Sequence, residues 1–115
     1  MAIDILKTVD IIEIMENYLE EVRPPEEIRN QLDIGYKIED QSVVLVEIRP
    51  IWTNPSEIRE YGYAKATFIK SKNVWRIFWM RASLKWQSYE PMPEVVTLQE
   101  FLEIVDEDKM GCFKG

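Results

Sequence analysis

The feature that most restricts the fold is a run of five short apolar segments between residues 32 and 90, joined by short connections. Each segment has the alternation, or the β-branched and aromatic composition, that is typical of a β-strand. Parallel neighbours need a crossover of a dozen or more residues, whereas antiparallel neighbours need only a turn. The sequence therefore predicts an antiparallel meander. The five segments are Leu32–Ile38, Val43–Arg49, Tyr61–Lys70, Val74–Arg81 and Lys85–Glu90.

Helical patterns lie before and after these segments. Apolar residues at helical spacing predict a first helix over Val9–Val22, with Thr8 or Asp10 as its N-cap. A capping-box pattern that begins at Thr97 predicts a second helix ending near 106–108. We therefore expect an α+β fold, in which a single antiparallel meander sheet of about five strands carries an N-terminal and a C-terminal helix on one face.

Length and composition exclude several classes of protein. A chain of 115 residues has the size of one domain, so we expect residues 1–115 to form a single domain. The absence of histidine excludes a Ser-His-Asp triad and a His-ligated zinc site. The one cysteine, Cys112, is expected to pack as a small apolar side chain. Without a signal-peptide pattern or a long apolar run, we expect a cytoplasmic protein with no cofactor and no membrane contact.

Charge and aromatic residues are unevenly distributed. The net charge is −7, yet residues 61–90 hold six basic residues against Glu90 alone, together with eight of the 13 aromatic residues. One interpretation is a basic sheet beneath acidic helices. The other is a face that binds an anionic ligand or single-stranded nucleic acid, where cations meet phosphates and rings stack on bases. The overall acidity disfavours a polyanion such as nucleic acid.

Strand register adds a candidate site. Pairing Ile34 with Ile48 keeps apolar residues on one face, and we expect both helices on the face of Ile34, Val46 and Ala66. The other face then holds a mid-sheet charged cluster, which forms either solvated ion pairs such as Asp33–Arg49 or the floor of a binding site. If a ligand-binding face exists, we expect it among the charged and aromatic residues of this side. These candidate residues are Glu47, Arg49, Lys65, Trp79 and Arg81.

The same charged cluster also has a catalytic interpretation. The pattern Asp33…Glu47-Ile48-Arg49 resembles restriction-endonuclease-like nucleases, in which Asp…Glu-x-Lys holds Mg²⁺ and supports the attacking water. Here Arg49 stands in the place of the lysine, and a guanidinium is always protonated, so it cannot act as a base. A metal-dependent nuclease is therefore the third of three functional interpretations, and the sequence favours a protein that is not an enzyme.

The fourth predicted strand is apolar on both faces, because Trp75 and Trp79 point one way while Phe78 and Met80 point the other. Such a strand is covered on both faces. Two helices cover one face, and the second is expected to be shielded by the Ile51–Glu60 loop with Trp52, by a ligand or by a second subunit. We therefore expect a homodimer.

Several motifs carry a family resemblance. They include E-I-R-P-x-W at Glu47–Trp52, W-M-R-A-x-L-K-W at Trp79–Trp86 and Gly-Cys-Phe at 111–113. From Arg23 to its end, the chain resembles a family of small bacterial proteins known only as a domain of unknown function. The resemblance implies a bacterial, cytoplasmic domain and brings no activity with it. We expect a non-catalytic binding or protein-interaction module, with an anionic-ligand or single-stranded nucleic-acid binder as the alternative.

Overall fold

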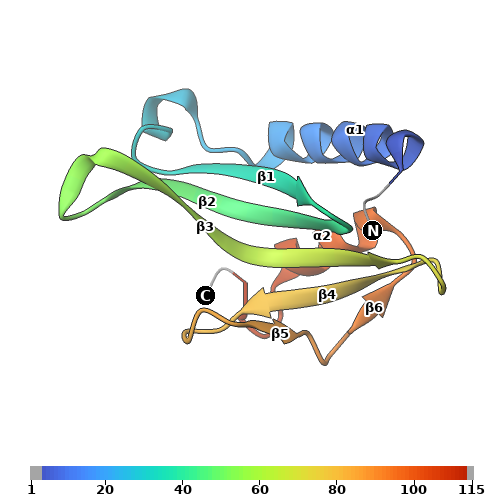
Figure 1. Cartoon of the computed structure of the whole chain (residues 1–115). Helices are drawn as coiled ribbons and strands as arrows, with labels where there is room; N and C mark the ends of the chain where they lie inside the picture. The colour runs from blue at the N-terminus through green and yellow to red at the C-terminus, as the bar shows by residue number, and fades with distance from the viewer. Residues whose placement is uncertain (1–3, 114–115) are drawn as a thin grey trace.

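The computed structural model describes residues 4–113, which form an antiparallel sheet and two long helices (Figure 1). Strands β1 to β5 lie side by side in chain order, and a short β6 pairs with β4 along the same edge as β5. The predicted α+β meander is confirmed, with β6 as an addition. The elements are α1 (Ile5–Val22), the 3-10 turn η1 (Glu26–Ile28), β1 (Asp33–Glu39), β2 (Ser42–Ile51), β3 (Asn54–Ile69), β4 (Val74–Met80), β5 (Trp86–Ser88), β6 (Glu94–Val95) and α2 (Leu98–Glu107).

Both long helices pack on one face of the sheet, as predicted, and we call this side the helix face. Ala64 and Ala66 of β3 are completely buried beneath them, and such small side chains let a helix approach the strand closely. Burial of each larger apolar side chain in this layer contributes roughly 1.5–3 kcal/mol. The buried helix residues are Ile11, Met15 and Tyr18 of α1 and Leu98, Phe101, Leu102 and Val105 of α2.

The helix ends confirm one prediction and correct another. The Thr97 capping box is present. The Thr97 hydroxyl accepts a hydrogen bond from the backbone N–H of Glu100, and the Glu100 carboxylate accepts one from the backbone N–H of Thr97. Helix α1, however, begins at Ile5 rather than near Val9. Its N-cap is Asp4, whose carboxylate accepts from the backbone N–H of Lys7, so the predicted caps at Thr8 and Asp10 were wrong.

The predicted register of the first hairpin is wrong by one residue. Ile34 pairs with Glu47 instead of Ile48. A one-residue shift moves every β2 side chain to the opposite face. Val43 and Leu45 therefore lie beneath the helices, while Val46 lies on the other side, which we call the open face.

A β-bulge in β3 changes the alternation along this strand. Leu45 pairs with Ala64 and the next β2 residue, Val46, pairs with Gly62, so Tyr63 is an extra residue with no partner of its own. Tyr63 and Ala64 are both buried and both belong to the helix-face core. A bulge of this kind bends its strand and increases the local twist.

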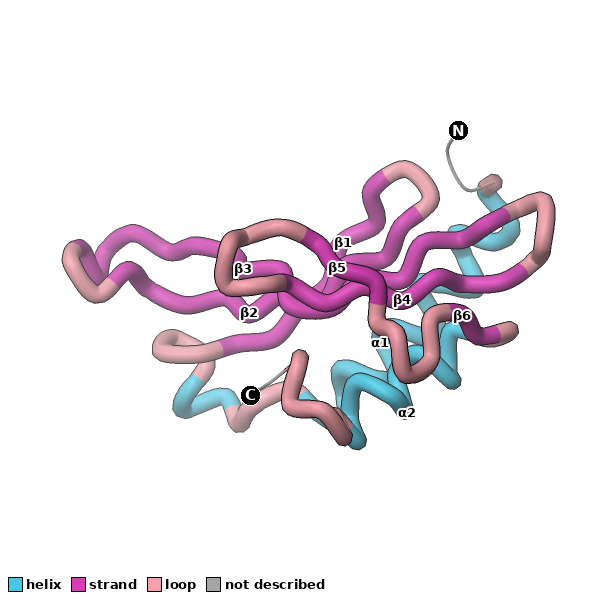
Figure 2. Tube along the Cα trace, turned by 90° about the horizontal axis from the view of Figure 1, so that it is seen from below, coloured by secondary structure: helices cyan, strands magenta, loops and turns pink. Residues whose placement is uncertain are grey.

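The segment Ile51–Glu60, predicted to be a loop, is mostly strand. β2 and β3 continue outward to a tight turn at Trp52 and Thr53, with Ile51 paired to Asn54. We call residues 49–59 the arm, because Figures 1 and 2 show this end of the hairpin projecting beyond the rest of the sheet. Pro50 and Pro55 favoured a loop in sequence, but both are tolerated here because the arm has unpaired outer edges.

The open face is covered by the sheet itself rather than by the predicted Trp52 loop. A Cβ atom placed on Gly62 of β3 would lie 3.2 Å from the Trp86 ring and 3.2 Å from Val44, so the Trp86 ring of β5 lies across β3 and meets β2. Val44 and Val46 are both buried although no helix covers them, and Val44 lies beside this ring. Trp52 is 90% exposed and shields nothing in the body.

Candidate functional site

The five residues predicted to form a ligand-binding face do not come together on one side of the sheet. Glu47 lies on the helix face, in register with Ile34, and Trp79 pairs with Ala64 on that same face. Lys65 lies on the open face, in register with Val44 and Phe78. The other two candidates are exposed: Arg49 is in the arm and Arg81 follows the end of β4.

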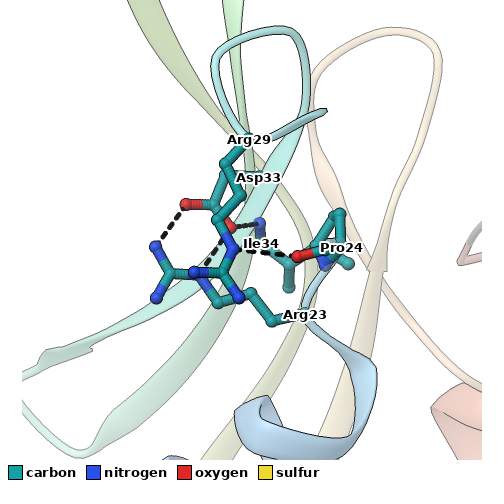
Figure 3. A network of polar contacts seen from close by, with 5 residues as sticks. All are labelled: Arg23, Pro24, Arg29, Asp33 and Ile34. Atoms are coloured by element: carbon teal, nitrogen blue, oxygen red, sulfur yellow. Dashed lines mark hydrogen bonds and ion pairs between the residues drawn. The ribbon is translucent and has the colours of Figure 1, made fainter. Parts of the chain in front are cut away.

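Asp33 forms a different ion pair from the predicted one with Arg49. Its carboxylate accepts two hydrogen bonds from the Arg23 guanidinium, at 2.8 and 2.7 Å, and a third from the backbone N–H of Ile34 at 2.8 Å (Figure 3). The Arg23 guanidinium holds the pKa of the Asp33 carboxyl below its ordinary value, while burial opposes this shift. Nearby, Arg29 donates to the carbonyl oxygen of Pro24, so the network joins the α1–β1 connection to the start of β1.

This register does not form the two-carboxylate arrangement that a nuclease needs. Asp33 pairs with Ile48 and Glu47 pairs with Ile34, so strand alternation directs the two carboxylates to opposite faces. Within residues 4–113, no group of three or more Asp, Glu or Cys side chains is arranged to hold a metal ion. No helix in this part of the chain is long and apolar enough to cross a membrane.

Glu47 instead borders a small cavity of about 130 Å³ between α1 and the sheet, together with Tyr18 and Tyr63. The Tyr18 hydroxyl donates to Asp106 Oδ1 at 2.7 Å, which connects α1 to α2. Burial raises the pKa of both tyrosines above the ordinary value, with the Asp106 hydrogen bond adding to the shift at Tyr18. Both hydroxyls therefore stay protonated, and that of Tyr18 acts as a structural donor.

The C-terminal cysteine behaves as the sequence predicted. Cys112 is partly buried and packs against the helix-face core. Burial raises the pKa of its thiol, and the nearby Asp108 acts in the same direction. A thiol with a raised pKa carries little thiolate at neutral pH, which argues against a reactive role.

The arm has two chemically different sides. Arg49 and Arg59 lie directly opposite each other, and the Arg49 guanidinium is stacked 4.7 Å from the centre of the Tyr61 ring. Pro50 and Ile58 are paired on the other side, and Ile58 is 61% exposed. Like charges directly opposite each other destabilise a ribbon, so the arginine pair gains from a nearby negative charge. Glu57 supplies such a charge to Arg59, in an exposed ion pair at 3.7 Å.

The arm lies outside the layers that stabilise the rest of the sheet. Pairing with β1 ends at Asp33 and Ile48, and pairing with β4 ends at Ala64 and Trp79. Beyond these residues β2 and β3 pair only with each other. A two-stranded ribbon is marginally stable alone in water, so a partner surface would stabilise the arm. Sequence reasoning missed this surface because it treated residues 51–60 as a loop.

Helix α1 presents an acidic surface. Lys7 in the first turn is the one basic residue of α1, and none occurs between Thr8 and Val22, where all the carboxylates of this helix lie. Glu16 accepts a hydrogen bond from the Tyr36 hydroxyl at 2.9 Å, and the others extend into solvent. The exposed acids are Asp10, Glu13, Glu16, Glu20 and Glu21.

Comparison with known proteins places this chain in a family. It matches the family described as Domain of unknown function (DUF3024) over residues 3–115, and the chain therefore belongs to that family. No curated protein matches it, and no solved structure matches it. The sequence resemblance to a domain-of-unknown-function family is confirmed, and the family carries no assigned activity.

Proposed function

We propose that the protein is a non-catalytic interaction module that associates with a second copy of itself through the arm. The observation that carries this proposal is Trp52, which is 90% exposed at the tip of an ordered hairpin that projects from the body. A tryptophan has a large apolar surface, and tryptophan and arginine are the residues that contribute most to binding energy at protein interfaces. The arm presents both residue types.

Charge complementarity supports a second copy as the partner. The arm presents two facing arginines, Arg49 and Arg59, and α1 of another copy presents a run of exposed carboxylates. In a two-fold symmetric dimer each arm lies against the α1 helix of the other copy, and both contacts form together. Such a pairing neutralises the repulsion within the arginine pair and covers Trp52.

Sedimentation equilibrium over a concentration series tests the proposal. We expect a monomer–dimer equilibrium that weakens as the salt concentration rises, because charged pairs at the rim of an interface are screened. Trp52→Ala should raise the dimer Kd at least tenfold, which corresponds to about 1.4 kcal/mol. The matched control is Val96→Ala, which removes an apolar side chain that is 66% exposed outside the arm and should leave the Kd unchanged.

A charge-reversal cycle tests the choice of partner surface. Arg49→Glu with Arg59→Glu should abolish association, and so should Glu13→Lys with Glu20→Lys on one side of α1. A mixture of the two double variants should form a heterodimer. In one of its contacts an arm with glutamates meets an α1 with lysines, so opposite charges again face each other, and in its other contact both surfaces are unchanged. A monomer at every concentration overturns the proposal. If both double variants dimerise with an unchanged Kd, or if their mixture stays monomeric, α1 is not the surface that the arm contacts.

A further inference from the structure

A hollow of about 360 Å³ lies on the open face of the sheet, on the opposite side from both helices. Ligand sites for small molecules begin at roughly 300 Å³, so this hollow has room for a small ligand. Its floor is formed by Val44 and Gly62, and one wall is the Trp86 ring. The rest of its lining includes Lys37, Glu39, Asp40, Ser42 and Lys65.

Lys65 supplies a cation to the lining of this hollow. Its Nζ atom lies 4.9 Å from the centre of the Phe78 ring and 4.8 Å from the centre of the Trp86 ring, so two aromatic faces hold the ammonium in place. The side chain is half-buried, and no carboxylate of residues 4–113 lies within ion-pair distance of it. Burial lowers the pKa of Lys65, and Glu39 acts in the opposite direction from further away.

This ammonium is therefore a donor without an ionic acceptor. An ammonium that has lost part of its hydration gains free energy from a hydrogen-bonded counter-ion. The two rings stabilise the charge through their faces and accept no conventional N–H hydrogen bond. Ser42, which also lines the hollow, places a hydroxyl nearby and hydrogen-bonds with Thr67 at 2.7 Å. A carboxylate in the hollow would meet an ammonium and a hydroxyl together.

Trp86 offers a flat apolar surface beside this cation. Its ring lies on Gly62, where a Cβ would be only 3.2 Å away, so the absence of a side chain at Gly62 is what lets the indole lie low over the sheet. One side of the ring then faces the sheet and the rest borders the hollow. Planar apolar groups stack on such surfaces, as aromatic pairs do.

We propose that this hollow binds a small organic monoanion, a molecule with one carboxylate and a flat apolar body. The carboxylate is received by Lys65 Nζ and the Ser42 hydroxyl, and the flat body lies against Trp86. The proposal goes beyond self-association through the arm, since the hollow and the arm share no residue.

The charges at the rim restrict the ligand to one negative charge. Glu39 and Asp40 border the hollow, and Lys37 forms an ion pair with Glu39 at 2.9 Å. Lys37 is therefore already neutralised and does not offset the charge of a second anionic group on the ligand. A ligand that also carried phosphate groups would be repelled by these carboxylates and by the net charge of −7 of the whole chain. A nucleic-acid strand is therefore a poor fit, although Lys65 and Trp86 of the hollow belong to the basic aromatic segment 61–90.

Three probes of one shape and different charge test the proposal by NMR titration of the full chain. Benzoate, benzamide and benzylamine share an aromatic ring and differ in carrying a negative, a neutral and a positive group. We expect saturable shifts of the Trp86 indole and Lys65 signals with benzoate, and at least tenfold weaker binding of the other two. Equal binding of all three probes, or no shift with benzoate at millimolar concentration, overturns the proposal. A single-stranded oligonucleotide is the fourth probe, and if it binds the hollow more tightly than benzoate, the proposal is wrong and the site is one for nucleic acid.

Matched variants separate a ligand-binding lysine from a structural one. Lys65→Met keeps the length and the apolar stem of the side chain but removes the charge, and should weaken benzoate binding at least tenfold. Lys65→Arg keeps the charge and should retain binding. Lys70→Met, just after the end of the same strand and exposed, is the control and should bind like the original chain. If Lys65→Met binds benzoate as tightly as the original chain, Lys65 does not receive the anion and the proposal is wrong.

Discussion

The inner and outer halves of the β2–β3 hairpin are made from the same two strands, yet they differ in almost every physical respect. In the inner half, β2 has four consecutive buried residues, Val43 to Val46. In the outer half, every residue from Trp52 to Glu60 is exposed. The backbone pairing continues through both halves with the same antiparallel pattern.

The difference shows that backbone pairing between two strands does not by itself bury their side chains. The inner half is buried because β1 and β4 flank it, α1 and α2 cover one face and the Trp86 ring covers part of the other. The outer half has none of these neighbours. Stability is therefore concentrated in the inner half, and the outer half has surface available for a partner. Four substitutions, taken from the largest expected effect to the smallest, test this division.

The largest effect is expected at Leu45, which is completely buried in the inner half. Leu45→Ala removes apolar contacts and leaves a cavity under both helices, which costs about 2–5 kcal/mol of unfolding free energy. Urea denaturation followed by circular dichroism measures this change. A cost close to that of an exposed substitution would show that the inner half is not the stabilising part of the hairpin.

The second effect concerns the open face. Gly62→Ala places a Cβ 3.2 Å from both Trp86 and Val44, and such overpacking costs about 1–3 kcal/mol. Gly35→Ala is the control, because its tightest neighbour is the flexible end of Ile48. In a Trp86→Ala background the cost of Gly62→Ala should fall markedly, since the obstructing ring is gone. An unchanged cost would mean that Trp86 does not cover this face in solution.

Much of the fold could be predicted from the sequence because several signals were unambiguous. The short connections between strands required an antiparallel meander, and the pattern from Thr97 to Glu100 determined where α2 begins. The register could not be predicted, because β2 is apolar at both odd and even positions. With Val43, Val44, Leu45 and Val46 all buried, hydrophobicity does not distinguish the two faces of the strand.

The third effect lies at the boundary between the two halves, where Asp33 is in register with Ile48. The pKa of Asp33 is lowered in the folded chain, so its ion pair stabilises fully above the ordinary carboxyl pKa of about 3.9. This contribution to stability is lost as the pH falls from the ordinary carboxyl pKa through the lower pKa that Asp33 has in the folded chain. Asp33→Asn should therefore reduce stability at pH 7 and have little effect at the acid end of that range. Thermal unfolding of both proteins across this interval measures the difference, and parallel curves would contradict it.

The smallest effect on stability is expected at Trp52. Because the side chain is 90% exposed, Trp52→Ala should change the unfolding free energy of the monomer by no more than about 0.5 kcal/mol. The measurement is made at a concentration low enough to exclude dimers. A large loss of monomer stability would show that Trp52 packs within its own chain, which would remove the division between the two halves.

The candidate site was only partly predictable, and Lys65 shows why. The sequence indicates that Lys65 is a cation in an aromatic segment, but its two ring neighbours depend on strand pairing and on the path of β5. The assumed register of the first hairpin, shifted by one residue, placed Glu47 with Lys65. Trp79 was included without a register for β3 and β4, and it pairs with Ala64 on the helix face. Asp33 was assigned to Arg49, whereas its partner Arg23 comes from the end of α1, a contact that no local pattern indicates.

The unpaired residue Tyr63 sets the direction of the arm. It lies in the buried core, between the part of β3 that holds Lys65 and the part that forms the arm, and its extra length bends and twists the strand at that point. A relative with the same arm but without this residue would hold it at another angle. Evolution could therefore redirect this protein toward a differently shaped partner through a single insertion or deletion inside the core, with every contact residue on the surface unchanged.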